Sequence, residues 1–227
     1  MQYGQFCPIA KAMEILGERW SLLIVRELLM GARRFNELQR GLSLISPTIL
    51  TKRLTDLADA GVIIRKKMHG QRGHEYFLTQ MGQELMPVIM QVGEWGMRWA
   101  RGSMDDAELD LELLMLYLQR SVRPDHLPGD ETVVRFHFTD LGQLANWWLV
   151  VTDEHTEVCV QDPGKDVDLY FNVDLRTMVE VWMGDITYRH AIKSGRLQLV
   201  GPASLTRNVT TWLAPATFAG IAPAREI

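Results

Sequence analysis

Apolar and polar positions divide most cleanly between residues 46 and 61. Three leucines recur at i, i+4 and i+7, the spacing of one buried stripe on a helix. They are Leu50, Leu54 and Leu57. Ser46 suits the N-cap of such a helix, Pro47 suits its first position, and Gly61 suits the point where it stops. The pattern therefore predicts an amphipathic helix that ends just before Gly61.

The opposite side of this predicted helix carries short hydroxyl groups and one long cation. It consists of Thr48, Thr51, Lys52 and Thr55. No carboxylate stands among these four, so the side suits a helix in a major groove, where hydroxyls and an amine reach base edges and phosphates. The alternative is an ordinary solvated helix face. The residues that follow the helix favour DNA.

A β-hairpin is predicted directly after the helix. A β-branched run begins at Val62, a glycine-rich basic turn follows, and an aromatic run begins at Glu75. The first strand and the tip carry Arg65, Lys66, Lys67 and Arg72. Upstream, residues 20–29 predict a helix, Gly31 a break and residues 34–38 a second short helix. The order helix, turn, helix and basic hairpin is that of a winged helix-turn-helix domain.

The second half of the chain mixes strand and helix patterns. Alternation or β-branched runs predict strands at 132–138, 147–152, 156–160, 166–173 and 197–200. Helical spacing predicts helices at 108–120, after Asp174, from about 185 to 194, and at 202–213. The expected result is an antiparallel sheet with helices over one face. The whole chain is thus of the α+β class, with a winged-helix domain at 1–102 and an α+β domain at 103–227.

Charge separates the two halves. Over 227 residues the chain has 24 basic and 28 acidic side chains, a net charge of −4. Residues 1–104 hold 14 basic and 9 acidic side chains, a charge of +5, which leaves 10 basic and 19 acidic, or −9, for the remainder. The basic surface therefore belongs to the half that is predicted to contact DNA.

Other sequence features narrow the functional class. The first residues lack a secretory signal, no apolar run is long enough to cross a bilayer, and two distant cysteines fit a reducing cytoplasm. We therefore expect a cytoplasmic protein without membrane contact. Six dispersed histidines give no metal-ligand spacing, and no phosphate loop, dinucleotide fingerprint or nucleophile motif is present. We expect no metal, no cofactor and no enzymatic activity, although the sequence Asp153-Glu154-His155 leaves acid–base catalysis as a third-ranked alternative.

The first hundred residues resemble the HxlR-type winged-helix transcriptional regulators. The resemblance rests on Cys7-Pro-Ile-Ala10, Leu16-Gly-Glu-Arg-Trp20, Leu28-Leu-Met-Gly31, Leu50-Thr-Lys-Arg-Leu54 and Glu75-Tyr76, in that order. It implies a homodimer held by the first helix and by the helix after the hairpin. We expect that second helix to run from Gln80 to Trp99 with a kink at Pro87. The wing tip lacks the prolines of many relatives, so the wing contacts are the least firmly implied.

The run from Asp166 to Leu213 resembles the sterol-carrier-protein-like fold. Asp168-Leu-Tyr-Phe-Asn-Val-Asp174 and Ser194-Gly-Arg-Leu-Gln-Leu-Val-Gly201 carry this resemblance. It implies a tunnel for lipids or other apolar molecules, and hence an apolar effector. Phe136, Phe138, Trp147, Met178 and Trp182 are the expected lining. The alternative is that these side chains fill a solid core.

The favoured hypothesis is a homodimeric transcriptional regulator that binds double-stranded DNA. The expected DNA contacts are Arg33, Arg34, Ser46, Thr48, Thr51, Lys52, Arg53, Arg65, Lys66 and Arg72. Thr48, Thr51 and Lys52 would approach bases, and the arginines and Lys66 would hold phosphates. Cys7 is a candidate redox sensor, for which a small buried side chain is the favoured alternative. A carrier or sequestering protein that uses the winged-helix half only to dimerise is the competing class.

Overall fold

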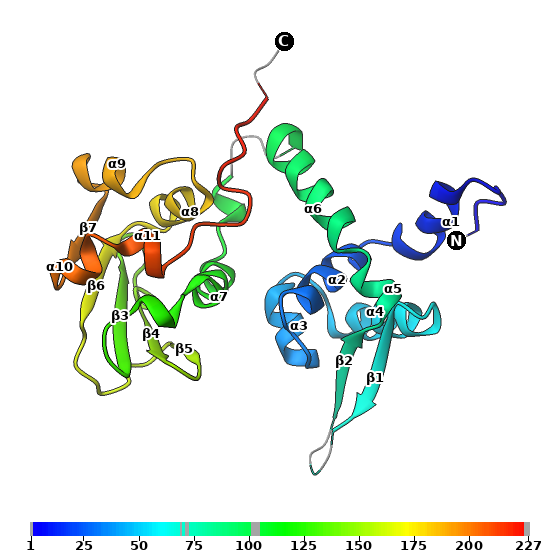
Figure 1. Ribbon diagram of the computed structural model, residues 1–227, viewed down its shortest axis with the longest axis horizontal. Coiled ribbons are helices and arrows are strands. Elements are labelled where there is room, and N and C mark those ends of the chain that lie inside the picture. The colour runs from blue at the N-terminus through cyan, green and yellow to red at the C-terminus, as the bar shows by residue number, and fades with distance from the viewer. Residues whose placement is uncertain (1, 69, 71–72, 101–104, 225–227) are drawn as a thin grey trace. The chain divides into compact units, whose positions relative to one another are not determined.

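The chain divides into two structural units, which are described separately here. A computed structural model describes residues 2–68, 70, 73–100 and 105–224, and the units span Met1–Gly96 and Met97–Ile227. Figure 1 shows helices and a hairpin in the first unit and a sheet with helices in the second.

The first unit is a helix-turn-helix fold with a wing. Its elements are α1 (Pro8–Leu16), α2 (Ser21–Leu29), α3 (Phe35–Gly41), α4 (Pro47–Asp59), β1 (Ile63–Lys67), β2 (His74–Leu78), α5 (Gln80–Gln83) and α6 (Met86–Trp95). β1 and β2 pair antiparallel, with Ile63 opposite Leu78 and Lys67 opposite His74. Arg34 forms an isolated antiparallel bridge with Glu75, which anchors the hairpin next to α3.

Helix α4 confirms the predicted amphipathic pattern. The Ser46 Oγ accepts a hydrogen bond of 3.3 Å from the backbone N–H of Ile49, as an N-cap should. Leu50, Leu54 and Leu57 are buried in the core of this unit. Gly61 has a φ of +78°, a left-handed conformation that an L side chain rarely adopts and that ends the helix.

The prediction of one continuous helix from Gln80 to Trp99 is wrong. The chain forms α5, a turn, then α6, and a π-helical segment over Gly96–Ala100. Pro87 does not kink a helix interior, because it lies in the first turn of α6, where a missing N–H leaves no intrahelical bond unmade.

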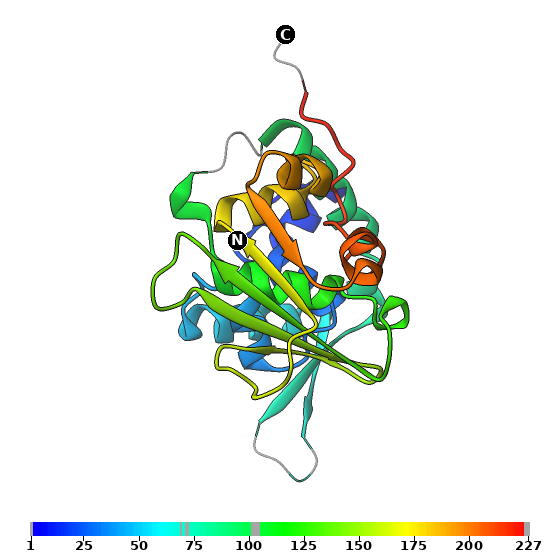
Figure 2. The same cartoon turned by 90° about the vertical axis from the view of Figure 1, so that its left-hand side faces the viewer.

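The second unit is a five-stranded sheet with helices packed on one face. Its strands are β3 (Glu131–Phe138), β4 (Asn146–Thr152), β5 (Thr156–Cys159), β6 (Leu169–Val173) and β7 (Leu197–Val200), in the order β5-β4-β3-β6-β7. The helices are α7 (Leu111–Ser121), α8 (Leu175–Met183), α9 (Tyr188–Lys193), α10 (Ala203–Thr206) and α11 (Val209–Trp212), preceded by short 3₁₀ turns at Asp106–Glu108 and Pro124–His126. Figure 2 shows strands of this sheet in front of α7.

Two expectations for this unit are wrong. The sheet is not purely antiparallel, because β3 pairs in parallel with β6, with Phe136 opposite Phe171. The helix expected over 202–213 is instead two short helices, α10 and α11, separated by Arg207 and Asn208. The expected sheet covered by helices is confirmed, and its core joins α7, α8 and α11 to β3 and β6.

Within the described residues, no helix has both the length and the apolar character needed to span a membrane.

Candidate nucleic-acid interface and effector domain

The outer face of α4 carries the four polar residues that the sequence places there. Thr48, Thr51, Lys52 and Thr55 are all exposed. The Thr51 hydroxyl donates a 2.9 Å hydrogen bond to the Pro47 carbonyl, and the Thr55 hydroxyl donates one of 3.0 Å to the Thr51 carbonyl. Because these two hydroxyl protons are used inside the helix, Thr51 and Thr55 offer acceptor oxygens and methyl groups. Lys52 is the long donor of this face.

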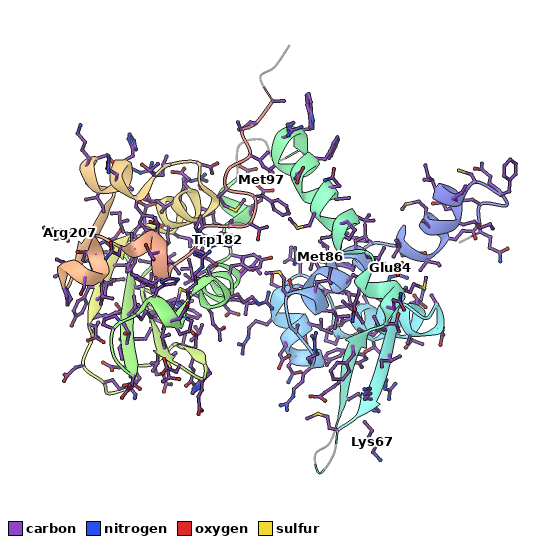
Figure 3. The ribbon with its side chains drawn as sticks, in the orientation of Figure 1. Lys67, Glu84, Met86, Met97, Trp182 and Arg207 are labelled. Carbon is purple, nitrogen blue, oxygen red and sulfur yellow. The ribbon has the colours of Figure 1, made fainter. Side chains whose placement is uncertain are left out.

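The hairpin that follows α4 in the sequence carries a row of cations on its first strand. Arg65, Lys66 and Lys67 are exposed along β1. The Arg65 guanidinium lies 2.9 Å from Nε2 of His74 across the hairpin, and the Lys66 ammonium lies 5.0 Å from the centre of the Phe77 ring. These contacts involve the charged ends of two cations that stay exposed to solvent. Lys67 lies toward the far end of the hairpin (Figure 3), and the predicted contact Arg72 lies outside the described residues.

Arg53 has an unexpected place in the structure. Its guanidinium donates to Glu18 at 2.7 Å and to Asp56 at 2.8 Å, and its side chain is only 13% exposed. Two carboxylates already neutralise this cation, so it ties α4 to the segment before α2. We therefore leave Arg53 out of the set of candidate phosphate contacts.

The two arginines before α3 differ from each other. Arg33 is half-buried and donates to the carbonyls of Leu28 and Ala32, at 2.7 and 2.9 Å. Arg34 has an exposed side chain. Glu37 accepts hydrogen bonds from the backbone N–H groups of both residues and so fixes the start of α3. Arg33 therefore braces the turn, and Arg34 has the freer guanidinium.

Some exposed residues on or near α4 were not among the DNA contacts predicted from the sequence. Ile49 lies exposed on the first turn of α4, Leu44 is 85% exposed in the turn before it, and Arg40 is exposed at the end of α3. The sequence signal that could have identified Ile49 as a contact is that this apolar residue interrupts the polar face of α4. In a major groove such a side chain would meet thymine methyl groups.

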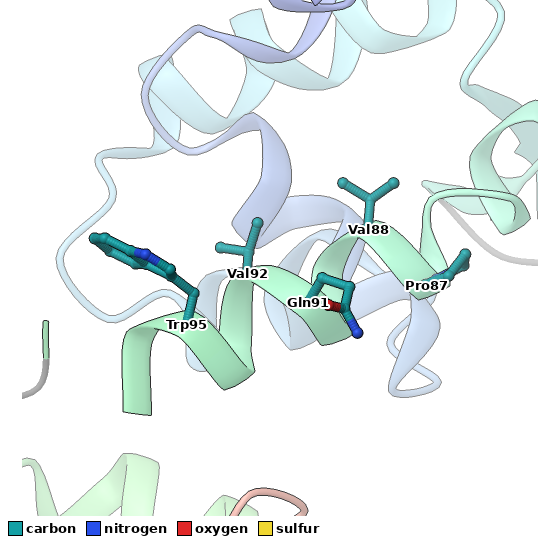
Figure 4. Close-up of a pocket in the computed structure, with 5 residues that line it drawn as sticks. All are labelled: Pro87, Val88, Gln91, Val92 and Trp95. Carbon is teal, nitrogen blue, oxygen red and sulfur yellow. The ribbon is translucent and has the colours of Figure 1, made fainter. Parts of the chain in front are cut away.

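A second exposed surface of this unit is apolar. On α6, Val88 and Val92 are about half exposed and Trp95 is 61% exposed. Figure 4 shows these three side chains projecting to the same side of α6, where Pro87 and Gln91 complete the lining of a shallow groove of about 620 Å³. On and before α1, Phe6, Ile9 and Met13 are also exposed. Surfaces of this kind mark sites of association.

Residues 15–104 match the HxlR-like helix-turn-helix family. The matching stretch of the transcriptional regulator YvaP of Bacillus subtilis is 36% identical over 101 residues, which is 44% of this chain and 94% of YvaP. The chain belongs to the HxlR-like helix-turn-helix family. The uncharacterized HTH-type transcriptional regulator Mb3122 of Mycobacterium bovis is 40% identical over 89 residues, which cover 39% of this chain but only 56% of that relative.

One solved structure is also similar in sequence to part of this chain. The reduced form of the transcriptional regulator YodB from B. subtilis is 29% identical over 40% of this chain and 92% of its own, with a TM-score of 0.36.

The other half of this HxlR-like chain matches a second family. Residues 115–214 match the SCP-2 sterol transfer family. The resemblances identified from the sequence are therefore both confirmed.

The expected ligand-lining residues lie between the sheet and the helices. Phe136, Phe138 and Met178 are fully buried, and Trp147 is almost so. The Phe136 ring stacks on Phe171 at 4.6 Å between centroids. In this structure these side chains therefore belong to a packed core, which was the alternative considered from the sequence.

Trp182 differs from the other four. It is only partly buried, its ring stacks on Tyr117 at 5.1 Å, and its Nε1 donates a 3.0 Å hydrogen bond to Ser121 Oγ. These contacts join α8 to α7 near the edge of the helical layer (Figure 3).

The two cysteines lie in different environments. Cys7 is the N-cap residue of α1 and is partly exposed. Cys159 ends β5, where burial raises the pKa of its thiol, with a further contribution from the neighbouring charge of Glu157. Among the described residues, no group of three His, Cys, Asp or Glu side chains is placed to hold a metal ion.

Proposed function

We propose that this protein is a homodimeric transcriptional regulator that inserts α4 into the major groove of duplex DNA. The observation that carries the proposal is the outer face of α4. Its exposed threonines and Lys52 include no carboxylate, and three buried leucines hold the helix rigidly in place. The N-terminal turns of such a helix contact base edges in helix-turn-helix proteins.

The wing and the turn before α3 would supply the phosphate contacts. Arg34, Arg65, Lys66 and Arg72 are the candidates, with Lys67 added because it is exposed on the same strand. Backbone phosphates fix register without selecting sequence, so these cations would act on affinity rather than on base preference. Ser46 would act by capping α4, since its hydroxyl oxygen already accepts a hydrogen bond from Ile49.

Salt dependence tests DNA binding directly. We expect the logarithm of the association constant of the full chain for duplex DNA to fall linearly with the logarithm of salt concentration. The slope, divided by roughly 0.9, gives the number of phosphates neutralised. Absent binding, or binding unaffected by salt, would favour a carrier protein that uses its winged helix only to dimerise.

Dimerisation through α1 and α6 is the second part of the proposal. The exposed apolar residues of α6, Val88, Val92 and Trp95, form a continuous side of one helix. Joining two copies there would cover apolar side chains that are otherwise in water. Sedimentation of the full chain should give twice the mass of one chain.

An apolar effector is the third part, supported by the match of residues 115–214 to the SCP-2 sterol transfer family. We expect a ligand to enter beside the partly buried Trp182, to displace part of the packed core around Met178, and to change the dimer's affinity for DNA. The test titrates the full chain with a fluorescent fatty acid and then repeats the DNA titration at saturation. If DNA affinity is unchanged at saturation, the bound fatty acid does not regulate DNA binding.

A further inference from the structure

Three cations gather at one groove in the acidic half of the chain. The groove lies between α9 and the α10–α11 segment and has a volume of about 660 Å³. Arg189 and Lys193 line it from α9. Arg207, labelled in Figure 3, lines it from the α10–α11 segment. The nine described residues that line it include no carboxylate. This is a local excess of positive charge in a half with a formal charge of −9.

These three cations have no ion-pair partner within the part of the chain that the structure describes. Other cations of the same unit do: Lys165 pairs with Glu131, Arg176 with Asp106 and Arg196 with Glu180. The three groove cations therefore lack the carboxylate partners that Lys165, Arg176 and Arg196 have.

The stability of α9 accounts for Lys193, which lies in the last turn, where the helix dipole favours a cation, but not for Arg189. Arg189 and Lys193 are four residues apart on one helix, a spacing at which like charges repel. Arg189 also lies in the first turn, where the helix dipole disfavours a cation. A bound anion would remove both penalties.

The remaining lining defines what kind of anion fits. Thr187 and Thr210 add hydroxyl groups, whereas the Thr206 hydroxyl already donates to the Pro202 carbonyl at 3.2 Å, and Ile192 is an exposed apolar side chain. Tyr188 is buried against the groove, and burial raises the pKa of its phenol, so it adds no negative charge. Arginine and lysine together suit a group with several oxygens and more than one negative charge. The volume is in the range of small-molecule sites.

We propose that this groove binds a phosphate ester, with the phosphoryl group among Arg189, Lys193 and Arg207 and the organic part against Ile192. A phospholipid headgroup and a soluble phosphomonoester share this chemistry. The site is separate from the apolar interior considered above, and it does not depend on DNA binding by the N-terminal unit.

The test measures binding of two probes to the full chain by calorimetry and by vesicle flotation. The soluble probe is glycerol 3-phosphate, and the membrane probe is phosphatidylcholine vesicles with and without phosphatidate. We expect at least one probe to bind and the binding to weaken with salt. Arg189→Ala and Arg207→Ala should each weaken it roughly tenfold, while Lys193→Arg should retain it.

Arg123→Ala is the matched control, because Arg123 is an exposed cation of the same unit that does not line the groove. Thermal unfolding of each variant checks that the fold is kept. Equal loss for the control and the groove variants, or no binding of either probe, would overturn the proposal. So would displacement of the soluble probe by duplex DNA together with weaker DNA binding by the groove variants, because the groove would then be a nucleic-acid contact.

Discussion

The two units of this chain present their chemistry in opposite ways. The N-terminal unit carries it on exposed faces of single helices, the polar face of α4 and the apolar side of α6, each made by residues close together in sequence. The C-terminal unit has its aromatic residues inside, and its cationic groove joins residues 187–193 to 206–210. Surfaces of the first kind follow from helical periodicity, whereas sites of the second kind depend on the fold.

The largest expected effect tests whether the two units unfold independently of each other. Phe171→Ala removes a fully buried ring that contacts Phe136 and Trp212, and should destabilise the C-terminal unit by about 3–5 kcal/mol. Denaturant unfolding should show the loss in one of two transitions, while DNA affinity below that transition stays unchanged. The matched variant Leu54→Ala should instead lower the other transition, by about 2–5 kcal/mol, and reduce DNA binding. A single shared transition would contradict this separation.

The next effect concerns the apolar side of α6. Trp95→Asp places a charge where the proposed interface buries a large ring, and should weaken dimerisation by about 2–4 kcal/mol, or roughly 30- to 1,000-fold. Sedimentation equilibrium measures the change. Leu44→Asp is the control, since Leu44 is similarly exposed but lies before α4. Equal dimerisation by the two variants would place the interface elsewhere.

A smaller effect separates base recognition from phosphate contact. Lys52→Ala should cost about 1–3 kcal/mol at the preferred site and less on random DNA, which relaxes sequence preference. Lys66→Ala, and equally Arg72→Ala, should weaken binding evenly across sequences and reduce the salt slope by about 1. Titrations of one specific and one random duplex at several salt concentrations measure both. Equal losses on both duplexes for Lys52→Ala would remove its proposed role.

The smallest effect concerns the cysteines. Because burial raises the pKa of Cys159, its thiolate is scarcer at neutral pH than that of a free thiol, and alkylation should increase only at more alkaline pH. Mass spectrometry after iodoacetamide treatment should therefore find Cys159 labelled more slowly than a free cysteine at pH 7. Cys7→Ser should leave DNA binding and its response to peroxide unchanged. A lost peroxide response would support a thiol-based regulator instead.

Local patterns predicted much of the N-terminal unit. The leucine stripe, the Ser46 cap and the Gly61 stop each depend on residues within one or two turns, so the sequence contains the whole signal. The break before Pro87 could not be placed in the same way, since proline permits either a kink or a new helix start. The Arg53 ion pair with Glu18 also escaped prediction, because it joins residues 35 positions apart.

The C-terminal unit was predicted less completely for a related reason. Alternation in residues 166–173 indicates a strand and its buried face but carries no information on its direction, so the parallel pairing of β3 with β6 was missed. The helix expected over 202–213 is divided at Arg207 and Asn208, and the buried Trp212 Nε1 donates to the Leu205 carbonyl across the division at 3.1 Å. The cationic groove depends on this division, since Arg207 lies between the two short helices.

Selection of host genomic fragments by the full chain, with excess random DNA as competitor, tests the central claim most directly. A dimer that presents two α4 helices should recover a few sites that share an inverted repeat, with half-sites about one helical turn apart. Recovery of random fragments, with or without a fatty acid present, would contradict sequence recognition by α4.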